Sequence, residues 1–345
     1  MHQSDVGVWT VECLPVFERF GCPEIVALDD KGRCTVLNSY SGKWTPWVAV
    51  QDGDWLGGIA HADVDPRRPG RELYVGGKRG NLYQLCPHPQ GGFDSNVIAY
   101  LPGKEIHTLA AAEIDGSRDG VELLAFTHPG GLYLLSPGPE PGSFTSQLLE
   151  ELPGRVRDAV VLQDPNGRMI GVATVSRTGE VRLLRLEGGT PAWTTLYRTE
   201  MGLGRLAVKP SRTGEPLVLY VTCDDGRVVR LEQRADGELD AADIYVGPQG
   251  PRGLVAGRFH EDPGVESVAL FGYSKKVQLL TRASDGWRIE TIFEDSDKGH
   301  WLAVGEVDGR NVTDEILLCG YAERVVMLAR PPGYGILPGT AVDRE

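Results

Sequence analysis

The sequence predicts an all-β fold: a seven-bladed β-propeller with four antiparallel strands per blade, the last blade being completed by the N-terminal strand. Three observations predict it, namely a repeat of about fifty residues, four short apolar runs in each repeat, and a last repeat that ends after its third run. Residues 1–345 then form one domain. An open solenoid or a pair of β-sandwiches is the alternative, but neither explains a strand taken from the other end of the chain.

A glutamate at the start of a short apolar run marks the repeat. It occurs in "PEIVAL", "RELYVGG", "VELLAF", "VESVALF" and "DEILLCG", at Glu24, Glu72, Glu122, Glu266 and Glu315. The steps are 48, 50, 144 and 49 residues, and 144 covers three periods. Two degenerate copies are therefore expected near Gly171 and Leu217, which makes seven units.

Each unit supplies four strands in a fixed order. A run of small residues such as "LAAAEIDG" precedes the glutamate and suits the crowded region near a central axis. The glutamate run and a third run such as "NLYQLCP" follow as strands of a meander. An aromatic residue introduces the fourth, outermost strand in five units, at Trp44, Phe93, Phe144, Trp193 and Trp287.

The seventh unit lacks its fourth run, because "RVVMLARPPGYGILPG" leads into a tail at 331–345. The segment 8–14, "VWTVECL", has the aromatic-led pattern of the outermost strands. We therefore expect residues 8–14 to close the ring as the fourth strand of blade 7, which removes a free sheet edge.

The overall charge and the cysteines restrict the function classes. A net charge of −13 argues against binding to nucleic acid or to a membrane surface. Six cysteines without a CxxC spacing argue against a zinc knuckle or a disulfide scaffold. The first residues do not follow a signal-peptide pattern, so we expect a cytoplasmic protein.

Three segments, "ADVDPRRPGRELYVGG", "AEIDGSRDGVELLAF" and "GEVDGRNVTDEILLCG", resemble the FG-GAP or VCBS-type propeller repeat. In that family an aspartate-rich loop often binds calcium. Here Asp63 and Asp65 precede "PRRPG", so further carboxylates are missing from the loop. The resemblance allows one calcium at Glu113, Asp115 and Asp119, but turn formation and capping of loop amides fit these acids better.

Two weaker resemblances concern carbohydrate-degrading enzymes. The phrase "DVDPRRPGRE" is similar to a loop of rhamnogalacturonan lyases, and the blade style is similar to the propellers of aldos-2-ulose dehydratases. By analogy alone, these resemblances imply elimination chemistry on carbohydrates, because a propeller is a scaffold shared by many functions.

Basic residues recur where the chain enters the innermost strand of each blade, at the mouth of the central funnel. The position of His300 corresponds to His107, to a point near Gly57, to the 155–157 segment, and to points near Arg205 and Arg252. Because guanidinium groups bind carboxylates and phosphates bidentately, this pattern favours an anionic ligand. The predicted ligand-binding residues are Arg157, Arg205, Arg252, Trp55, Trp301 and Lys298; blade packing is the alternative role for the two tryptophans.

Three hypotheses compete for His107 and His300. Both can be structural residues inherited with the repeat; they can act as general acid and base; or they can share a divalent metal ion with His61 or Glu105. We assign no cofactor and no metal ligand, and a divalent ion remains the third hypothesis.

The function predicted from these residues is binding of a small, oxygen-rich, anionic molecule in the central funnel. If the protein is an enzyme, it is a lyase or isomerase with His107 and His300 as catalytic residues. The alternative is a non-catalytic scaffold that binds a protein partner or a glycan on the face of the disc. A lectin with one sugar site per blade is disfavoured, because aromatic and acidic positions differ between units.

Overall fold

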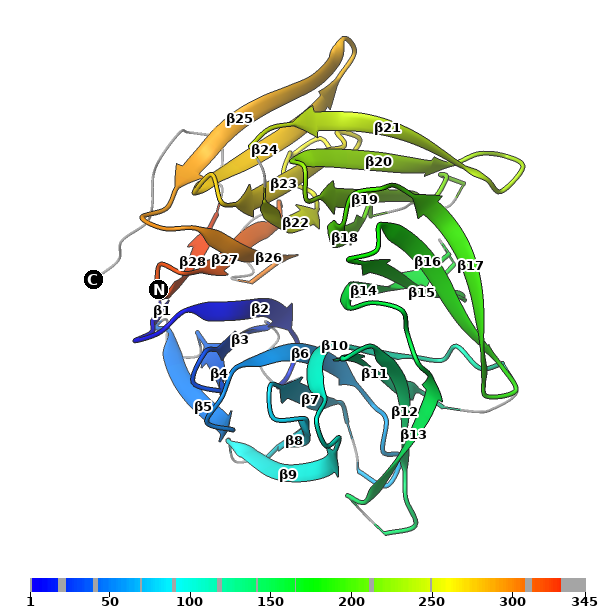
Figure 1. The fold of residues 1–345 in the computed structure, drawn as a ribbon. Helices are drawn as coiled ribbons and strands as arrows, with labels where there is room; N and C mark the ends of the chain where they lie inside the picture. Colours follow the sequence, from blue (N-terminus) through cyan, green and yellow to red (C-terminus); the bar gives the residue numbers. More distant parts are fainter. Residues whose placement is uncertain are drawn as a thin grey trace.

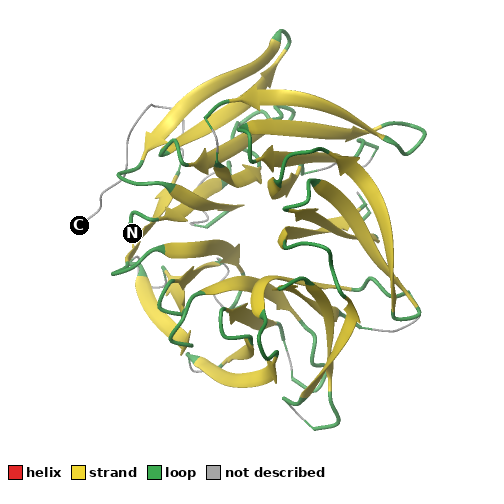
Figure 2. Ribbon diagram, in the orientation of Figure 1, coloured by secondary structure: helices red, strands yellow, loops and turns green. Residues whose placement is uncertain are grey.

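The computed structural model describes residues 2–17, 23–39, 43–68, 70–88, 91–116, 120–140, 142–164, 166–210, 214–248, 250–307 and 312–329. Their strands form seven antiparallel sheets of four strands each, arranged as a ring of blades around a central axis (Figure 1). Strands and loops account for all of this part of the chain (Figure 2). The predicted fold class is confirmed.

The two inner positions of the blades are occupied as the small-residue and glutamate runs predict. The innermost strands are β2 (Val8–Leu14), β6 (Leu56–Ala62), β10 (Glu105–Ala112), β14 (Val156–Gln163), β18 (Leu203–Val208), β22 (Pro251–Ala256) and β26 (Gly299–Gly305). The second strands are β3 (Glu24–Asp29), β7 (Glu72–Gly77), β11 (Glu122–His128), β15 (Met169–Ser176), β19 (Val218–Cys223), β23 (Ser267–Gly272) and β27 (Glu315–Gly320).

The two outer positions complete each blade. The third strands are β4 (Arg33–Asn38), β8 (Asn81–Pro87), β12 (Gly131–Pro137), β16 (Glu180–Glu187), β20 (Arg227–Gln233), β24 (Lys276–Ala283) and β28 (Arg324–Leu328). The outermost strands of blades 1 to 7 are β5 (Thr45–Gln51), β9 (Phe93–Tyr100), β13 (Phe144–Glu150), β17 (Thr190–Arg198), β21 (Leu239–Val246), β25 (Gly286–Glu294) and β1 (His2–Gln3).

The N-terminus completes blade 7, but with other residues than those predicted. Strand β1 pairs with β28, so that His2 lies opposite Val325. The segment 8–14 was wrongly assigned to blade 7: it pairs with β3 and is the innermost strand of blade 1. Trp9 made it resemble an outermost strand, although its indole faces the central funnel. The predicted tail at 331–345 lies outside the described residues.

Charged contacts attach this short closing strand to blade 1. The Asp5 carboxylate accepts hydrogen bonds from Lys31 Nζ, at 2.5 Å, and from the Arg33 guanidinium. These two bonds lower the pKa of Asp5 to about 2. The Ser4 amide also donates to the Glu323 carbonyl oxygen at 2.7 Å. The ring closure therefore combines a two-residue ladder with exposed ion pairs.

The glutamate that marks the repeat holds the loop between the first and second strands. In four blades its carboxylate accepts a hydrogen bond from the backbone amide eight residues earlier. The pairs are Val16 to Glu24 at 2.9 Å, Val64 to Glu72 at 3.1 Å, Ile114 to Glu122 at 2.8 Å and Val307 to Glu315 at 2.7 Å. Burial raises the pKa of Glu24, Glu72 and Glu122. The repeated glutamate therefore has a structural role.

The hydrophobic core lies between neighbouring blades. Among the described residues there are seven buried clusters, and each combines side chains of two adjacent sheets. Small residues let the inner strands approach: a Cβ on Gly253 of blade 6 would lie 2.8 Å from the Leu302 amide nitrogen of blade 7. Each blade thus buries its apolar faces against two neighbours, which fixes the inner strands around the axis.

Of the residues that the structure describes, none belongs to a helix long and apolar enough to cross a membrane.

Candidate functional site

Near its start, the innermost strand of every blade breaks the register with the second strand; the break leaves one extra residue in six blades and two, Gly204 and Arg205, in blade 5, where Arg205 holds the repeat position. In blade 3, for example, Ile106 pairs with Thr127 and Thr108 with Phe126, which leaves His107 as an extra residue. The seven residues at these shifts recur every 47 to 50 residues, and we call them the bulge ring. They are Trp9, Gly57, His107, Arg157, Arg205, Arg252 and His300. The predicted correspondence of His300 with the other blades is thereby confirmed.

At each bulge the backbone carbonyl oxygen of the ring residue is free of the sheet ladder, whereas a regular ladder would pair it within the sheet. Side chains of a neighbouring blade bind four of these oxygens. His300 Nδ1 donates to the Trp9 oxygen at 2.6 Å, and Thr10 Oγ1 donates to the Gly57 oxygen at 3.0 Å. Arg205 donates to the Arg157 oxygen and to the Arg252 oxygen, both at 2.7 Å. The bulge ring therefore links neighbouring blades around the funnel.

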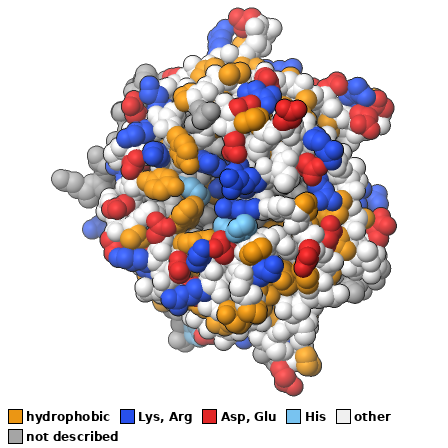
Figure 3. Space-filling model, in the orientation of Figure 1, with side chains coloured by type: hydrophobic (Ala, Val, Ile, Leu, Met, Phe, Trp, Pro, Cys, Tyr) orange, Lys and Arg blue, Asp and Glu red, His pale blue; other side chains and the backbone are white. Residues whose placement is uncertain are grey.

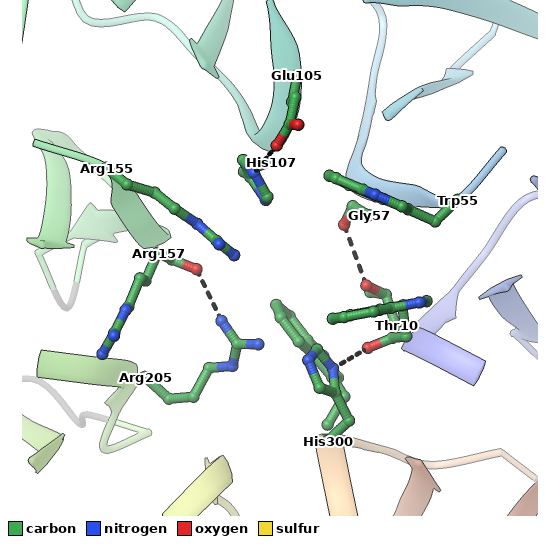
Figure 4. Close-up of a pocket in the computed structure, with 11 residues that line it drawn as sticks. Thr10, Trp55, Gly57, Glu105, His107, Arg155, Arg157, Arg205 and His300 are labelled. Atoms are coloured by element: carbon green, nitrogen blue, oxygen red, sulfur yellow. Dashed lines mark hydrogen bonds and ion pairs between the residues drawn. The ribbon is translucent and has the colours of Figure 1, made fainter. Parts of the chain in front are cut away.

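The funnel holds a cavity of about 190 Å³ at the level of the bulge ring. Basic side chains and histidine gather at this hollow in the middle of one face (Figure 3). The close-up places Arg155, Arg157 and Arg205 on one side, Trp55 on the other, and the two imidazoles at either end (Figure 4). The lining residues are Trp9, Thr10, Trp55, Gly57, Glu105, His107, Arg155, Arg157, Arg205, His300 and Trp301.

The three arginines of the hollow differ in their partners. Arg157 Nη1 donates to Asp224 at 2.7 Å and to the Leu203 carbonyl oxygen at 3.1 Å. Arg205 stacks over the Trp301 ring at 3.9 Å and donates two N–H groups to ring carbonyls. The guanidinium of Arg155 makes no hydrogen bond and no ion pair within the described residues, and its Nε is buried. Arg155 is thus the arginine of the hollow whose guanidinium makes no hydrogen bond within the described residues.

Burial and mutual repulsion destabilise the charge of these arginines. Burial, together with the nearby guanidinium of Arg157, lowers the pKa of Arg155 to about 10. Burial lowers the pKa of Arg205 to about 10 as well, although Asp158 opposes the shift. Both groups stay protonated at neutral pH. The hollow therefore carries positive charge that the free protein neutralises only in part.

Both imidazoles are neutral near pH 7. Burial and Arg155 lower the pKa of His107 to about 3, against the opposing effect of Glu105. Burial and Arg205 lower the pKa of His300 to about 3. His107 Nε2 lies 3.1 Å from Glu105 Oε2, and the other carboxylate oxygen of Glu105 contacts Lys78. Each imidazole is thus held by one fixed hydrogen bond.

Aromatic rings line the side of the hollow opposite the arginines. The Trp9 ring lies 5.9 Å from Trp55 and 4.3 Å from His300, and Trp55 lies 4.7 Å from His107. Gly57 occupies the ring position of blade 2 because a Cβ there would come within 3.0 Å of the Trp55 ring. This wall offers flat apolar surface next to the charged groups.

A pair of carboxyl groups lies close to the hollow. Trp301 Nε1 donates to Glu12 Oε1 at 3.1 Å, and Asp158 accepts the Leu206 amide at 3.0 Å. Burial, together with the nearby Asp158, raises the pKa of Glu12 to about 8. Glu12 is therefore mostly protonated at neutral pH and adds little negative charge beside the arginines.

The structure brings most of the predicted site residues together. Six of the eight line the hollow: His107, His300, Arg157, Arg205, Trp55 and Trp301. The other two, Arg252 and Lys298, lie beside the ring of Tyr273, at 5.1 and 5.6 Å from its centre. Arg252 and Lys298 are therefore placed outside the cavity lining, near Tyr273.

Five lining residues were missing from the predicted set, and one of them, Gly57, had been named only as the blade-2 counterpart of His300. Trp9 and Thr10 were missed because their strand was assigned to blade 7. Arg155 lies one residue before β14, and the sequence did not decide which residue of the 155–157 segment faces the funnel. Glu105 was considered only as a metal ligand, whereas it binds His107 and Lys78.

The described part of the chain holds no group of three or more His, Cys, Asp or Glu that could bind a metal ion, so neither metal hypothesis gains support there. His61 does not line the hollow. Among the acids of the predicted loops, Asp65 caps amides as expected, since it accepts the Arg67 and Gly142 amides. Asp119, named for the calcium hypothesis, lies outside the described residues.

Comparison with known proteins supports the fold alone. No protein-family model and no curated protein matches this sequence. Solved structures do match: the WD40 β-propeller domain of Doa1, at TM-score 0.63 and 12% identity, covers 96% of this chain and 95% of its own. BBS1N in complex with ARL6DN gives TM-score 0.66 at 11% identity in a mercury-soaked crystal, with 97% and 96% covered. A lead-soaked crystal of the same complex gives TM-score 0.65 at 11% identity over the same shares.

These matches extend over nearly the whole ring, and their low identities carry no activity to this chain. They support the seven-bladed propeller. The resemblance to FG-GAP or VCBS repeats, and that to lyase and dehydratase propellers, stay predictions from the sequence.

Proposed function

We propose that this protein is an interaction scaffold that binds an acidic peptide segment of a partner protein at the face that contains the hollow. An acidic side chain or a chain terminus of the partner enters the hollow beside the arginines. A propeller of similar fold, BBS1N, has been crystallised in complex with a protein, ARL6DN. That precedent makes a protein partner reasonable for a disc of this shape, although it does not identify one.

The observation that carries the proposal is the unpartnered guanidinium of Arg155. A partly buried cation without a counter-ion costs stability, and proteins retain such groups where a ligand supplies the missing charge. Arg157 and Arg205 stand on the same side of the hollow (Figure 4). The overall charge of −13 makes this concentration of arginines a local feature. A partner carboxylate offers the bidentate geometry that guanidinium groups bind best.

Exposed aromatic residues around the hollow fit a protein contact. Tyr321 and Tyr273 are 42% and 43% exposed, and Tyr321 lies 6.5 Å from the Trp9 ring and 6.3 Å from His300. Tyrosine and tryptophan are enriched at protein interfaces, because their rings bury a large area at little entropic cost. These aromatic side chains can pack against the partner beside the point where its acid enters.

Acid–base catalysis by His107 and His300 stays a prediction from the sequence. With pKa values of about 3, neither imidazole is in the imidazolium form that a general acid needs near pH 7. Efficient general acids and bases have pKa values near the working pH. The chemistry of the free site therefore supports binding better than elimination or isomerisation.

Selection from a random-peptide library with free carboxyl termini tests the proposal. The wild-type protein should enrich peptides rich in aspartate and glutamate, and the enrichment should weaken between 50 and 200 mM salt, as expected for charge pairing. Arg155→Glu should abolish the enrichment. Arg168→Glu is the matched control, since Arg168 is exposed on a loop of the same blade. Equal enrichment by Arg155→Glu, or no acidic preference in the wild type, would refute the proposal.

A further inference from the structure

The tautomers of His107 and His300 determine whether each end of the hollow offers a hydrogen-bond donor or an acceptor. His107 Nε2 faces the Glu105 carboxylate at 3.1 Å. The ion pair of Glu105 with Lys78 and its bond to His107 outweigh its burial and lower its pKa, so this carboxylate is ionised and only accepts. Nε2 therefore carries the proton of His107. Nδ1 is left as a lone pair, and no residue of the described chain bonds to it.

His300 reaches the same state by a different bond. Its Nδ1 lies 2.6 Å from the Trp9 carbonyl oxygen, which can only accept. The proton therefore resides on Nδ1, and Nε2 is the lone pair. Within the described ranges Nε2 has no hydrogen-bond partner. Both imidazoles are thus acceptors toward a ligand, and a bond of the opposite ring nitrogen fixes each tautomer.

The arginine side of the hollow has the opposite character. Arg155, Arg157 and Arg205 can only donate hydrogen bonds. A ligand that fills the space must therefore offer acceptor oxygens to the guanidinium groups and donor hydrogens to the imidazoles. A simple carboxylate satisfies the first requirement and leaves the two lone pairs without a donor, which costs affinity in a buried site.

The size of the hollow restricts the ligand further. Its cavity volume is about 190 Å³. Pockets for drug-sized ligands are larger, at about 300–1,000 Å³. The hollow therefore takes a group of only a few heavy atoms, with the Trp9 and Trp55 rings as its apolar wall.

We propose that the hollow recognises a carboxylate that bears an O–H or N–H donor on the neighbouring carbon. This inference rests on the proposed function, because it specifies the anionic group that the arginines receive. Two sources share this chemistry: a small 2-hydroxy acid, and the carboxyl-terminal residue of a peptide, whose amide N–H is next to the carboxylate. In both, the carboxylate binds the guanidinium groups and the donor binds an imidazole nitrogen.

Calorimetric titration with matched small molecules tests the inference. Lactate and propionate differ only in the hydroxyl group. We expect lactate to bind with a dissociation constant on the order of 1 mM, and propionate at least about fivefold more weakly, as for one unmade hydrogen bond. His300→Phe and His107→Phe each remove one acceptor, so at least one of them should reduce the ratio toward one while propionate still binds. Arg155→Met should weaken both acids, and Arg168→Met neither.

N-acetylalanine and its carboxamide distinguish the two sources. N-acetylalanine binding more tightly than lactate would assign the hollow to a peptide terminus, and the reverse order would assign it to a free hydroxy acid. Equal binding of lactate and propionate by the wild type overturns the inference and leaves the acidic-peptide proposal standing. If lactate is preferred but no acidic peptide is selected, the scaffold proposal fails and this inference holds. Absence of binding by both lactate and N-acetylalanine also overturns it.

Discussion

Two positions recur in the blades of this propeller, and they behave in opposite ways. The glutamate at the second strand is the same residue in five of the seven blades, and in four of them it makes the same bond to the amide eight residues earlier. The bulge ring keeps its backbone geometry and changes its side chain, from tryptophan and glycine to histidine and arginine. The repeat glutamate therefore serves the fold, whereas the bulge ring carries a different side chain in different blades.

The difference follows from what each position contacts. The glutamate acts within one blade, and every blade that uses it needs the same carboxylate for its loop. In four blades the bulge-ring residue offers its backbone carbonyl oxygen to a neighbouring blade, and this bond does not depend on the residue's own side chain. Only Arg205 and His300 donate such bonds with their ring side chains. The side chains of the ring are then free to differ, and together they make the hollow asymmetric: arginines on one side and aromatic rings on the other (Figure 4).

The largest effect should come from removing a repeat glutamate. Glu24 is 1% exposed and accepts the amides of Val16 and Phe17 at 2.9 and 3.1 Å. Glu24→Ala leaves both buried amides without an acceptor, and we expect the free energy of unfolding in urea to fall by about 3 kcal/mol. Glu24→Gln keeps a carbonyl oxygen in place and should lose about 1 kcal/mol.

Glu24→Ala should leave ligand binding unaltered in buffer without urea, provided that the variant is folded there. If Glu24→Ala unfolds at the wild-type urea concentration, the structural role of the repeat glutamate is refuted, and with it the contrast between the two positions.

Glu12 is a second buried glutamate of blade 1, and its ionisation should lower the stability of the folded protein. Burial and the nearby Asp158 raise its pKa from the ordinary 4.5 to about 8, so the folded protein keeps a proton that the unfolded chain releases. Stability from this group is therefore present below pH 4.5 and is lost as the pH rises toward 8. Glu12→Gln retains an acceptor for Trp301 and lacks this loss. The variant should be clearly more stable than the wild type at pH 8, with a difference that shrinks as the pH falls and almost vanishes at pH 4.

Urea unfolding at several pH values measures the difference between the two proteins. Parallel stability profiles for Glu12→Gln and the wild type would show that Glu12 is ionised in the folded state, and the hollow would then hold its own counter-charge.

Within the hollow, a substitution that abolishes anion binding should not destabilise the fold. Arg155→Met removes a cation that burial and Arg157 destabilise, so the free energy of unfolding should rise by about 1 kcal/mol while anion binding is lost. Arg168→Met on the exposed loop should change neither quantity. A clear loss of stability in Arg155→Met would mean that Arg155 has a structural partner in solution and belongs with the scaffold.

The smallest effect is expected at the ring closure. Bonds from Lys31 and Arg33 lower the pKa of Asp5 from 3.8 to about 2, so their contribution is present above pH 3.8 and disappears as the pH falls through about 2. Asp5→Asn should lower the thermal midpoint slightly at pH 5, because exposed ion pairs contribute little. At pH 2 the variant and the wild type should melt together, and a difference that persists there would contradict this account.

Much of the fold could be predicted from the sequence because the repeat is periodic and its glutamates carry one structural role. The closure was misassigned because an aromatic residue at the start of 8–14 is compatible with two positions, and only strand pairing decides between them. A single two-residue strand, His2–Gln3, is too short to leave a pattern in the sequence.

The candidate site could be predicted in part for the same reason. The spacing of the repeat predicted that His107, His300 and the arginines surround one funnel, since they occupy equivalent positions in their blades. The partners of those side chains come from other blades: Arg205 is bound by carbonyl oxygens 47 and 48 residues away in the chain. Which guanidinium stays free is a property of the assembled ring, so Arg155 could not be singled out beforehand.

The central claim is that Arg155 lacks a partner in the free protein and obtains one from a bound anion. A crystal structure of the protein grown with lactate tests this most directly. We predict a lactate carboxylate within hydrogen-bonding distance of the Arg155 guanidinium, with the lactate hydroxyl on Nε2 of His300 or Nδ1 of His107. A hollow filled only with water, or an Arg155 side chain paired with a carboxylate of its own chain, would contradict it.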